Sequence, residues 1–275
     1  MSRVYHNLFD SHMHSNNSRC AEHSLMYLAQ RAEEMGLMGM AVTDHIESLG
    51  FEPGGYKTRI YQSAVDTAKA SAAFRHRISL SFGVELGVFP GMYDFAEQAL
   101  GLYPYDFVLG ACHYSRQGEH FAEINYGALT EKERHTLMLE YFEDLTELVL
   151  WGGFDSIAHI NYPVRHASLK DNPCLSLTPY KEQVDALLRL LVDKGKSLDM
   201  GACGLGGLLE DALLPTWVFE RYRELGGELI TIGSGAHQAE SVGVGITQAM
   251  ELLSGLGYEY FTFYRARKPI TLRIV

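Results

Sequence analysis

The segment F-D-S-H-M-H-S, from Phe9 to Ser15, sets two histidines two residues apart in a short apolar stretch. On a β-strand, residues i and i+2 point to the same face, so the side chains of His12 and His14 converge on one point. A second apolar run, A-V-T-D-H, supplies another histidine where it ends, at His45. Imidazoles gathered in this way indicate a binding site for a metal cation.

The composition is that of a globular protein with a large core. The chain has 275 residues, of which 47% are hydrophobic and 21% charged, a length that suits one α/β barrel as well as two smaller domains. Its longest apolar stretches are far shorter than the roughly 18 to 20 residues that span a bilayer. No charged-then-apolar leader opens the sequence, so we expect a cytoplasmic protein without a membrane partner.

The net charge argues against a nucleic-acid-binding protein, and the spacing of the cysteines argues against a disulfide framework or a zinc ribbon. A net charge of −11 makes nucleic acid an improbable partner, because binding to phosphate backbones requires a basic surface. A small anionic substrate would instead need local positive charge, which metal ions supply. The four cysteines have no C-x-x-C spacing, and we expect reduced thiols at all of them: Cys20, Cys112, Cys174 and Cys203.

Short β-branched or apolar runs alternate with longer amphipathic ones. The runs predict seven strands, at 7–14, 39–45, 78–86, 107–114, 155–161, 197–202 and 229–235. Between them, apolar spacing and capping signals predict helices at 25–35, 130–151 and from 178 onward. This alternation predicts right-handed parallel βαβ units, closed into a barrel or, as the alternative, laid out as an open doubly wound sheet. No linker divides the chain, so we expect a single domain over residues 1–275.

The positions of the polar residues favour the barrel. Six predicted strands each deliver a metal-ligand type at or just after the C-terminal end, the rim where barrel enzymes form their active sites. One histidine on an apolar strand is more often a hydrogen-bonded core residue, but equivalent positions on several strands indicate a shared cluster. Glu85 is able to bridge two ions through its two oxygens. The residues are His12, His14, His45, Glu85, His113, His159 and His237.

The motifs at these strand ends resemble, in order and spacing, those of the polymerase-and-histidinol-phosphatase (PHP) superfamily. They are D-S-H-M-H-S at 10–15, T-D-H at 43–45, G-V-E at 83–85, G-A-C-H at 110–113, A-H-I-N at 158–161 and G-S-G-A-H at 233–237. C-A-E-H-S at 20–24, the strand at 107–114 and the closing Y-F-T-F-Y-R-A-R-K-P resemble the histidinol-phosphate phosphatase branch most. The resemblance implies a distorted (β/α)7 barrel that hydrolyses a phosphate monoester with two or three divalent ions of zinc, iron or manganese.

The same resemblance implies a ligand set for each ion. His12, His14 and Glu85 would hold the first metal, and Glu85, His113 and His159 would hold the second. His23, His45 and His237 would hold the third, although His23 by itself looks like a surface histidine. Glu85, His113 and His159 would thereby be the catalytic residues, together with Arg165.

Two aspartates flank these ligands. Asp10 points the same way as His12 on the predicted strand and could orient an imidazole, as carboxylates behind metal ligands often do. Asp44 precedes His45 and could instead face the barrel wall. For both, a solvated or helix-capping carboxylate is an equally good interpretation.

The sequence departs from the family pattern at two places. Gly235 stands where the family usually has an aspartate that ligates the first metal, so that ion would lack a charged ligand. The segment 201–207 lacks an asparagine near Gly201 and a phosphate-binding arginine near Gly206. Arg116 and Arg165 remain candidates for a bidentate contact with phosphate, unless they are only surface charges.

We therefore expect hydrolysis of a small phosphate monoester, with L-histidinol phosphate, in histidine biosynthesis, as the leading substrate. One alternative is a PHP-fold phosphoesterase with another small-molecule specificity. A second is a non-catalytic or regulatory protein, because of Gly235 and the missing arginine. An exonuclease-like phosphodiesterase fits the superfamily but not the acidic charge. The sequence does not define the oligomeric state.

Overall fold

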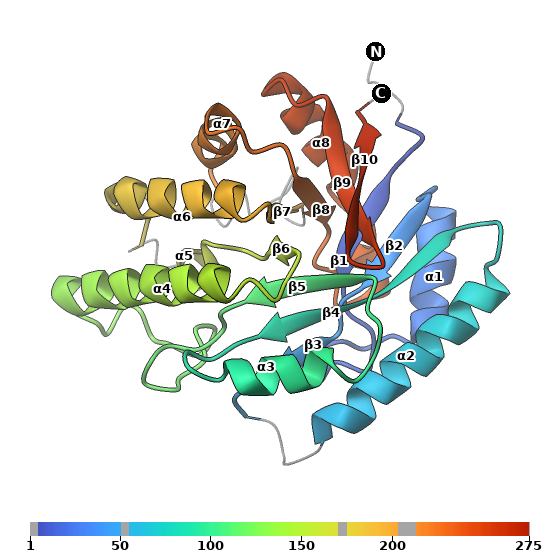
Figure 1. Cartoon of the computed structure of the whole chain (residues 1–275), viewed down its shortest axis with the longest axis horizontal. Coiled ribbons are helices and arrows are strands. Elements are labelled where there is room, and N and C mark those ends of the chain that lie inside the picture. The colour runs from blue at the N-terminus through green and yellow to red at the C-terminus, as the bar shows by residue number, and fades with distance from the viewer. Residues whose placement is uncertain (1–4, 51–54, 170–174, 203–212, 275) are drawn as a thin grey trace.

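One parallel sheet curls into a nearly closed barrel at the centre of the molecule (Figure 1). The structure, a computed structural model, describes residues 5–50, 55–169, 175–202 and 213–274. The strands run in the order β1-β2-β4-β5-β6-β7-β8, and β3 pairs with β4. Their bounds are β1 Phe9–Met13, β2 Gly39–Val42, β3 His45–Glu47, β4 Ser79–Gly87, β5 Phe107–Ala111, β6 Ser156–Ile157, β7 Ser197–Gly201 and β8 Ile230–Gly233. The predicted distorted (β/α)7 barrel is confirmed.

The barrel closes between its first strand and the segment after its last. Met13 forms a parallel bridge with Ala236. The backbone N–H of His14 donates to the carbonyl oxygen of Ala236 at 2.9 Å, and the N–H of Gly235 donates to that of His12 at 2.7 Å. The alternative of an open doubly wound sheet is therefore wrong.

Helices surround the barrel (Figure 1). They are α1 Leu25–Glu34, α2 Gly55–Ala73, α3 Tyr93–Leu100, α4 Glu131–Trp151, α5 Tyr162–Leu169, α6 Lys181–Asp193, α7 Thr216–Glu224 and α8 Ile246–Gly255, with short 3-10 turns η1 Thr178–Tyr180 and η3 Ala239–Ser241. The three helices predicted from apolar spacing and capping signals correspond to α1, α4 and the pair η1–α6. Among the described residues, no helix combines the length and the apolar character needed to cross a bilayer.

The strand predicted at 39–45 is interrupted and becomes β2 and β3. The interruption falls at Thr43 and Asp44, whose side chains bond to other segments: the Thr43 hydroxyl donates to the carbonyl oxygen of Met13, and the Asp44 carboxylate accepts from serines. The second piece, β3, then pairs with the C-terminal residues of β4, in a register that sets His45 directly beside Glu85. The break thus positions two of the predicted metal ligands.

A C-terminal hairpin, β9 Tyr260–Arg265 and β10 Lys268–Arg273, packs on the barrel. The ring of Phe263 stacks on Phe9 at 4.5 Å between centroids, and Tyr264 stacks on Phe107 at 5.1 Å. Phe9 and Phe107 begin β1 and β5, so the hairpin covers the N-terminal end of the barrel. The polar strand ends at the opposite rim are left to form a pocket.

Candidate metal centre

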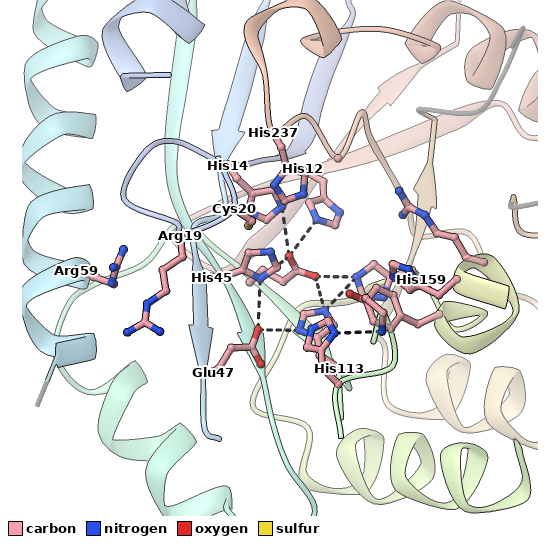
Figure 2. Close-up of a pocket in the computed structure, with 17 residues that line it drawn as sticks. His12, His14, Arg19, Cys20, His45, Glu47, Arg59, His113, His159 and His237 are labelled. Carbon is pink, nitrogen blue, oxygen red and sulfur yellow. Dashed lines mark hydrogen bonds and ion pairs between the residues drawn. The ribbon is translucent and has the colours of Figure 1, made fainter. Parts of the chain in front are cut away.

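A cavity of about 360 Å³ lies at the C-terminal ends of the strands. Its walls include Glu85 and six of the seven histidines predicted as ligands: His12, His14, His45, His113, His159 and His237. Figure 2 shows their rings gathered on one centre although they come from five different strands or strand ends. The sequence-based expectation that the strand ends meet is therefore fulfilled for these residues.

Glu85 is fully buried at this centre. Its two oxygens divide the surrounding rings into two sets. Oε1 lies 2.8 Å from Nε2 of His159 and 3.3 Å from Nε2 of His113. Oε2 lies 3.3 Å from Nε2 of His12, 3.4 Å from Nε2 of His14 and 3.2 Å from Nδ1 of His45.

Asp199 on β7 fixes the ring of His12, a role that sequence reasoning missed. Nδ1–H of His12 donates to Oδ2 of Asp199 at 3.1 Å, while Oδ1 of Asp199 accepts from the Thr231 hydroxyl at 2.6 Å. With the proton held on Nδ1, Nε2 faces Glu85 as a ligand atom. A carboxylate behind a ligating histidine is the usual support of a metal centre.

Glu47 on β3 supports His113 in the same way. Its Oε1 accepts from Nδ1–H of His113 at 2.7 Å and also lies 3.4 Å from Nδ1 of His45. Gly87 makes room for this side chain, since a Cβ there would lie 1.9 Å from Oε2 of Glu47. The missed signal is in T-D-H-I-E: Glu47 stands two residues after His45, the spacing that places side chains on one face of a strand.

The nearby carboxylates raise the pKa of some histidines at the centre, whereas burial lowers the pKa of others. Burial opposes the charged form of His12, but Glu85 and Asp199 outweigh it and raise its pKa to about 10. Burial likewise opposes the His113 cation, and Glu47 and Glu85 raise its pKa to about 9. For His159, burial dominates and lowers the pKa to about 4. The carboxylates therefore already hold positive charge here, which is the environment that a metal cation requires.

The donor atoms fit divalent cations. Buried Nδ1 atoms of His14, His159 and His237 have no hydrogen-bond partner among the described residues, whereas buried polar groups are normally paired. Three sets of donor atoms each lie within 4.8 Å of one another: His14, His45 and His237; His12, His14 and Glu85; and His45, Glu85 and His113. Imidazole and carboxylate ligands of this kind suit zinc, iron or manganese.

Two predicted site residues are not brought into the pocket. Arg116 instead pairs with Asp144 at 2.7 Å and with Glu143 at 3.0 Å. His23 is not among the residues lining the cavity, and its Nδ1 accepts a hydrogen bond from the backbone N–H of Ala239 at 3.2 Å. Both were assigned by sequence position, which does not show the direction of a side chain in a loop.

Other residues complete the cavity wall. The predicted Arg165 lines it, as do Arg19 and Arg59, which sequence reasoning did not single out; Figure 2 shows the last two on one side of the pocket. Cys20 lines it as well. Partial burial raises the pKa of the Cys20 thiol, but interactions with His237 and His45 outweigh this and lower it to about 6.

The backbone is unusual at two positions of the pocket. His159, two residues after the end of β6, has φ of 25°, and its carbonyl oxygen accepts a hydrogen bond from the Tyr141 hydroxyl at 3.1 Å. Non-glycine residues in this region are strained, and such strain is frequent at functional sites. Gly235 has φ of 62°, with no atom within 4 Å of the place that a Cβ would occupy.

The two flanking aspartates organise backbone and hydroxyl groups. Asp10 accepts hydrogen bonds from the backbone N–H groups of His12, Ser234 and Gly243, so orientation of an imidazole by Asp10 is wrong. Asp44 accepts from hydroxyls of three serines in neighbouring segments. The segment that lacks the expected arginine lies mostly outside the described residues, as does Cys203.

This fold and pocket define a class of protein. A sequence model of the PHP domain matches residues 10–202, more than half of the chain, and the protein belongs to the PHP domain family. The predicted family membership is confirmed.

Individual relatives are similar over nearly their whole length. The chain is 25% identical to a "Probable histidinol-phosphatase" of Deinococcus radiodurans, over 95% of this chain and 99% of that one. It is also 25% identical to a "Probable histidinol-phosphatase" of Thermotoga maritima, over 97% of this chain and 100% of that one. The crystal structure of histidinol phosphate phosphatase from Lactococcus lactis, complexed with zinc, L-histidinol and phosphate, has the same fold. The two structures align with a TM-score of 0.75 and 20% sequence identity, over 96% of this chain and 99% of that one.

Proposed function

We propose that this protein is a metal-dependent phosphoric monoester hydrolase that converts L-histidinol phosphate to L-histidinol and phosphate. The observation that carries the proposal is the buried Glu85, whose two oxygens each face a separate set of imidazole nitrogens. A carboxylate in that position bridges two cations. The names of the relatives supply the substrate, and the zinc, L-histidinol and phosphate in the Lactococcus lactis structure support both metal and substrate.

The ligands sort into sites around the bridge. His12, His14 and Glu85 would hold a first ion, and Glu85, His113 and His159 would hold a second. His45 and His237 would belong to a third site, and the centre would then take two or three ions of zinc, iron or manganese. When bound, such ions provide a nucleophile at neutral pH and neutralise phosphate oxygens.

The chain itself orients the ligands. Asp199 and Glu47 accept the Nδ1–H protons of His12 and His113, so that in the neutral form of each ring the lone pair is on Nε2 and faces the metal centre. Burial of Glu85, at 0% exposure, keeps water from competing for its oxygens. Catalysis then depends on rings that are oriented before the substrate arrives.

Arginines of the pocket bind the substrate phosphate. Arg165, at the start of α5, together with Arg19 and Arg59, places guanidinium groups in the cavity wall. A guanidinium matches phosphate oxygens with two parallel N–H bonds. They take the place of the arginine that the segment 201–207 lacks.

Aromatic rings of the same wall contact the organic part of the substrate. Tyr162 lies 4.5 Å from the His159 ring and 4.8 Å from the His113 ring, between centroids. His120 and His166 line the cavity beside it. Planar rings of this kind pack well against an imidazole group such as that of histidinol.

The test is phosphate release by protein loaded separately with zinc, iron or manganese. We expect kcat/KM for L-histidinol phosphate to exceed that for p-nitrophenyl phosphate by about 100-fold, the scale at which a binding pocket discriminates between substrates. Turnover of the aryl phosphate without that preference would support a phosphoesterase of other specificity. Absence of turnover with every metal would support the non-catalytic alternative that Gly235 raises.

A further inference from the structure

The loop between β1 and α1 places a sulfur atom at the cavity wall, next to two imidazoles. Cys20 lines the cavity, and its side chain interacts with those of His237 and His45. Figure 2 shows the residue on the same side of the pocket as His14 and His237. We propose that Cys20 binds the third metal ion through its sulfur, together with His45 and His237, in the position assigned from sequence to His23. This inference rests on the proposed metal centre.

The start of the loop is fixed to the segment that carries His45. The Asp44 carboxylate accepts from the backbone N–H of Ser15 at 2.7 Å, from its hydroxyl at 2.8 Å and from the Ser18 hydroxyl at 2.8 Å. The Ser18 oxygen in turn accepts from the backbone N–H of His45 at 3.0 Å. The backbone two residues before Cys20 is thus tied to a candidate ligand.

The end of the loop is fixed to the segment that carries His237. The backbone N–H of Glu22 donates to the carbonyl oxygen of His237 at 3.2 Å, and that of Asn16 donates to the carbonyl oxygen of His23 at 2.9 Å. Cys20 lies between these attachments, and so its position relative to both imidazoles is set by the fold.

His23 is unsuited to the same role. Its Nδ1 accepts the N–H of Ala239, so a neutral ring carries its proton on Nε2 and neither nitrogen has a lone pair for a cation. The ring packs against Tyr27, with 5.1 Å between centroids. These contacts give His23 a structural role in closing the loop against the segment after β8.

An independent observation points to a ligand at this place. Within the described part of the chain, the buried Nδ1 atom of His237 has no hydrogen-bond partner. His237, His45 and His14 also form a set of donor atoms that lie within 4.8 Å of one another. Imidazoles alone would leave such an ion without an anionic ligand. A thiolate supplies the negative charge, and mixed nitrogen and sulfur sets are typical of zinc.

The sulfur gives the third site a preference that the other two lack. Thiolate ligands favour zinc and iron over manganese, which prefers oxygen donors. The protein would therefore keep a zinc ion at this site under conditions in which manganese occupies the Glu85 bridge.

The first experiment is a titration of the metal-free protein with Co²⁺. We expect sulfur-to-cobalt charge-transfer absorption in the near ultraviolet, lost in Cys20→Ser and kept in two matched controls. His23→Asn retains an acceptor atom for Ala239, and Cys112→Ser removes a thiol that is 2% exposed. A spectrum without the band, or a band that persists in Cys20→Ser, would overturn the inference, as would its loss in His23→Asn alone.

The second experiment is alkylation of Cys20 by iodoacetamide, followed by peptide mass spectrometry. The side chain of Cys20 is exposed, so we expect rapid reaction of protein from which metal has been stripped. At free zinc of about 100 times Kd the rate should fall about 100-fold, because only metal-free protein reacts. An unchanged rate would refute coordination by sulfur.

Neither readout depends on turnover. An inactive protein with a Cys20-dependent cobalt band would defeat the proposed function and leave this inference standing. An active enzyme without the cobalt band would support the proposed function and refute coordination by Cys20.

Discussion

Two carboxylates that do not belong to the predicted ligand set determine how the imidazoles are held. Glu47 and Asp199 accept from Nδ1–H of His113 and His12, respectively. Burial raises the pKa of Glu47, but its contacts with His113 and His45 outweigh this and lower it to about 2. The carboxylate is therefore charged at any working pH and stabilises a cation nearby.

Replacing Glu47 with glutamine should weaken metal binding. The amide keeps an oxygen for the His113 ring but removes the negative charge, and loss of such a supporting partner costs about 10 to 100-fold in metal affinity or activity. Zinc affinity and the rate of phosphate release, measured on both proteins, are expected to fall together. Glu119→Gln, at an exposed carboxylate outside the cavity wall, is the control. Equal affinity in Glu47→Gln and the control would mean that Glu47 does not support the centre.

Gly235 occupies the place of the carboxylate that the family usually provides. An aspartate there should raise occupancy of the first ion and increase hydrolysis at limiting metal by about 10-fold or more, the scale on which supporting ligands act. There is room for its Cβ, and aspartate tolerates the φ of 62° better than most residues do.

Gly235→Ala is the matched control, because it introduces the same backbone strain without a carboxylate. A metal-concentration series of hydrolysis rates with metal analysis compares the three proteins. If the aspartate variant binds no more metal than the alanine variant and is no faster, another group already fills the position.

At the scale of elements, period-2 and period-3.6 patterns were enough to predict the barrel strands and three helices. The rule that strand ends converge brought together Glu85 and six histidines. Loop residues were beyond this reasoning, because a loop has no period: His23 was chosen by family position, and Cys20 was overlooked. β3 was also missed, since its three residues follow a break created by long-range hydrogen bonds of Thr43 and Asp44.

The capping box predicted at the start of α4 is present. The Thr130 hydroxyl accepts from the N–H of Glu133, whose carboxylate accepts from the N–H of Thr130 at 2.7 Å. Thr130→Ala should lower the free energy of unfolding by about 1 kcal/mol, because one helix N–H loses its partner. Urea denaturation measures the change. Thr136→Ala, at an exposed position inside the same helix, should cause no loss, because alanine is the better helix former; equal losses would contradict a capping role.

At the scale of the whole molecule, buried carboxylates at the C-terminal rim of the barrel attract positive charge to one site. In the metal-free protein this positive charge includes protons on His12 and His113, whose pKa values of about 10 and about 9 lie above neutrality. Coordination needs neutral imidazoles. Metal binding at pH 7 must therefore displace protons, and metal affinity should increase with pH until both rings are neutral in the free protein.

Calorimetry of zinc binding at pH 7 in two buffers of different ionisation enthalpy tests this exchange. We expect the apparent binding enthalpy to differ between the buffers, by an amount that corresponds to release of more than one proton. At a pH above about 10 the contribution from these two rings should vanish, since both are then neutral before zinc binds. Identical enthalpies in the two buffers at pH 7 would show that neither ring is protonated in the metal-free state.

The central claim is that Glu85 bridges the ions on which hydrolysis depends. The most direct measurement is the zinc content per chain of metal-replete wild-type protein and of Glu85→Gln, with release of phosphate from L-histidinol phosphate followed in the same samples. We predict more than one zinc ion per wild-type chain, and loss of more than one ion and nearly all turnover in the variant. A wild-type protein that binds a single ion, or a variant that keeps its zinc and its activity, would contradict the account.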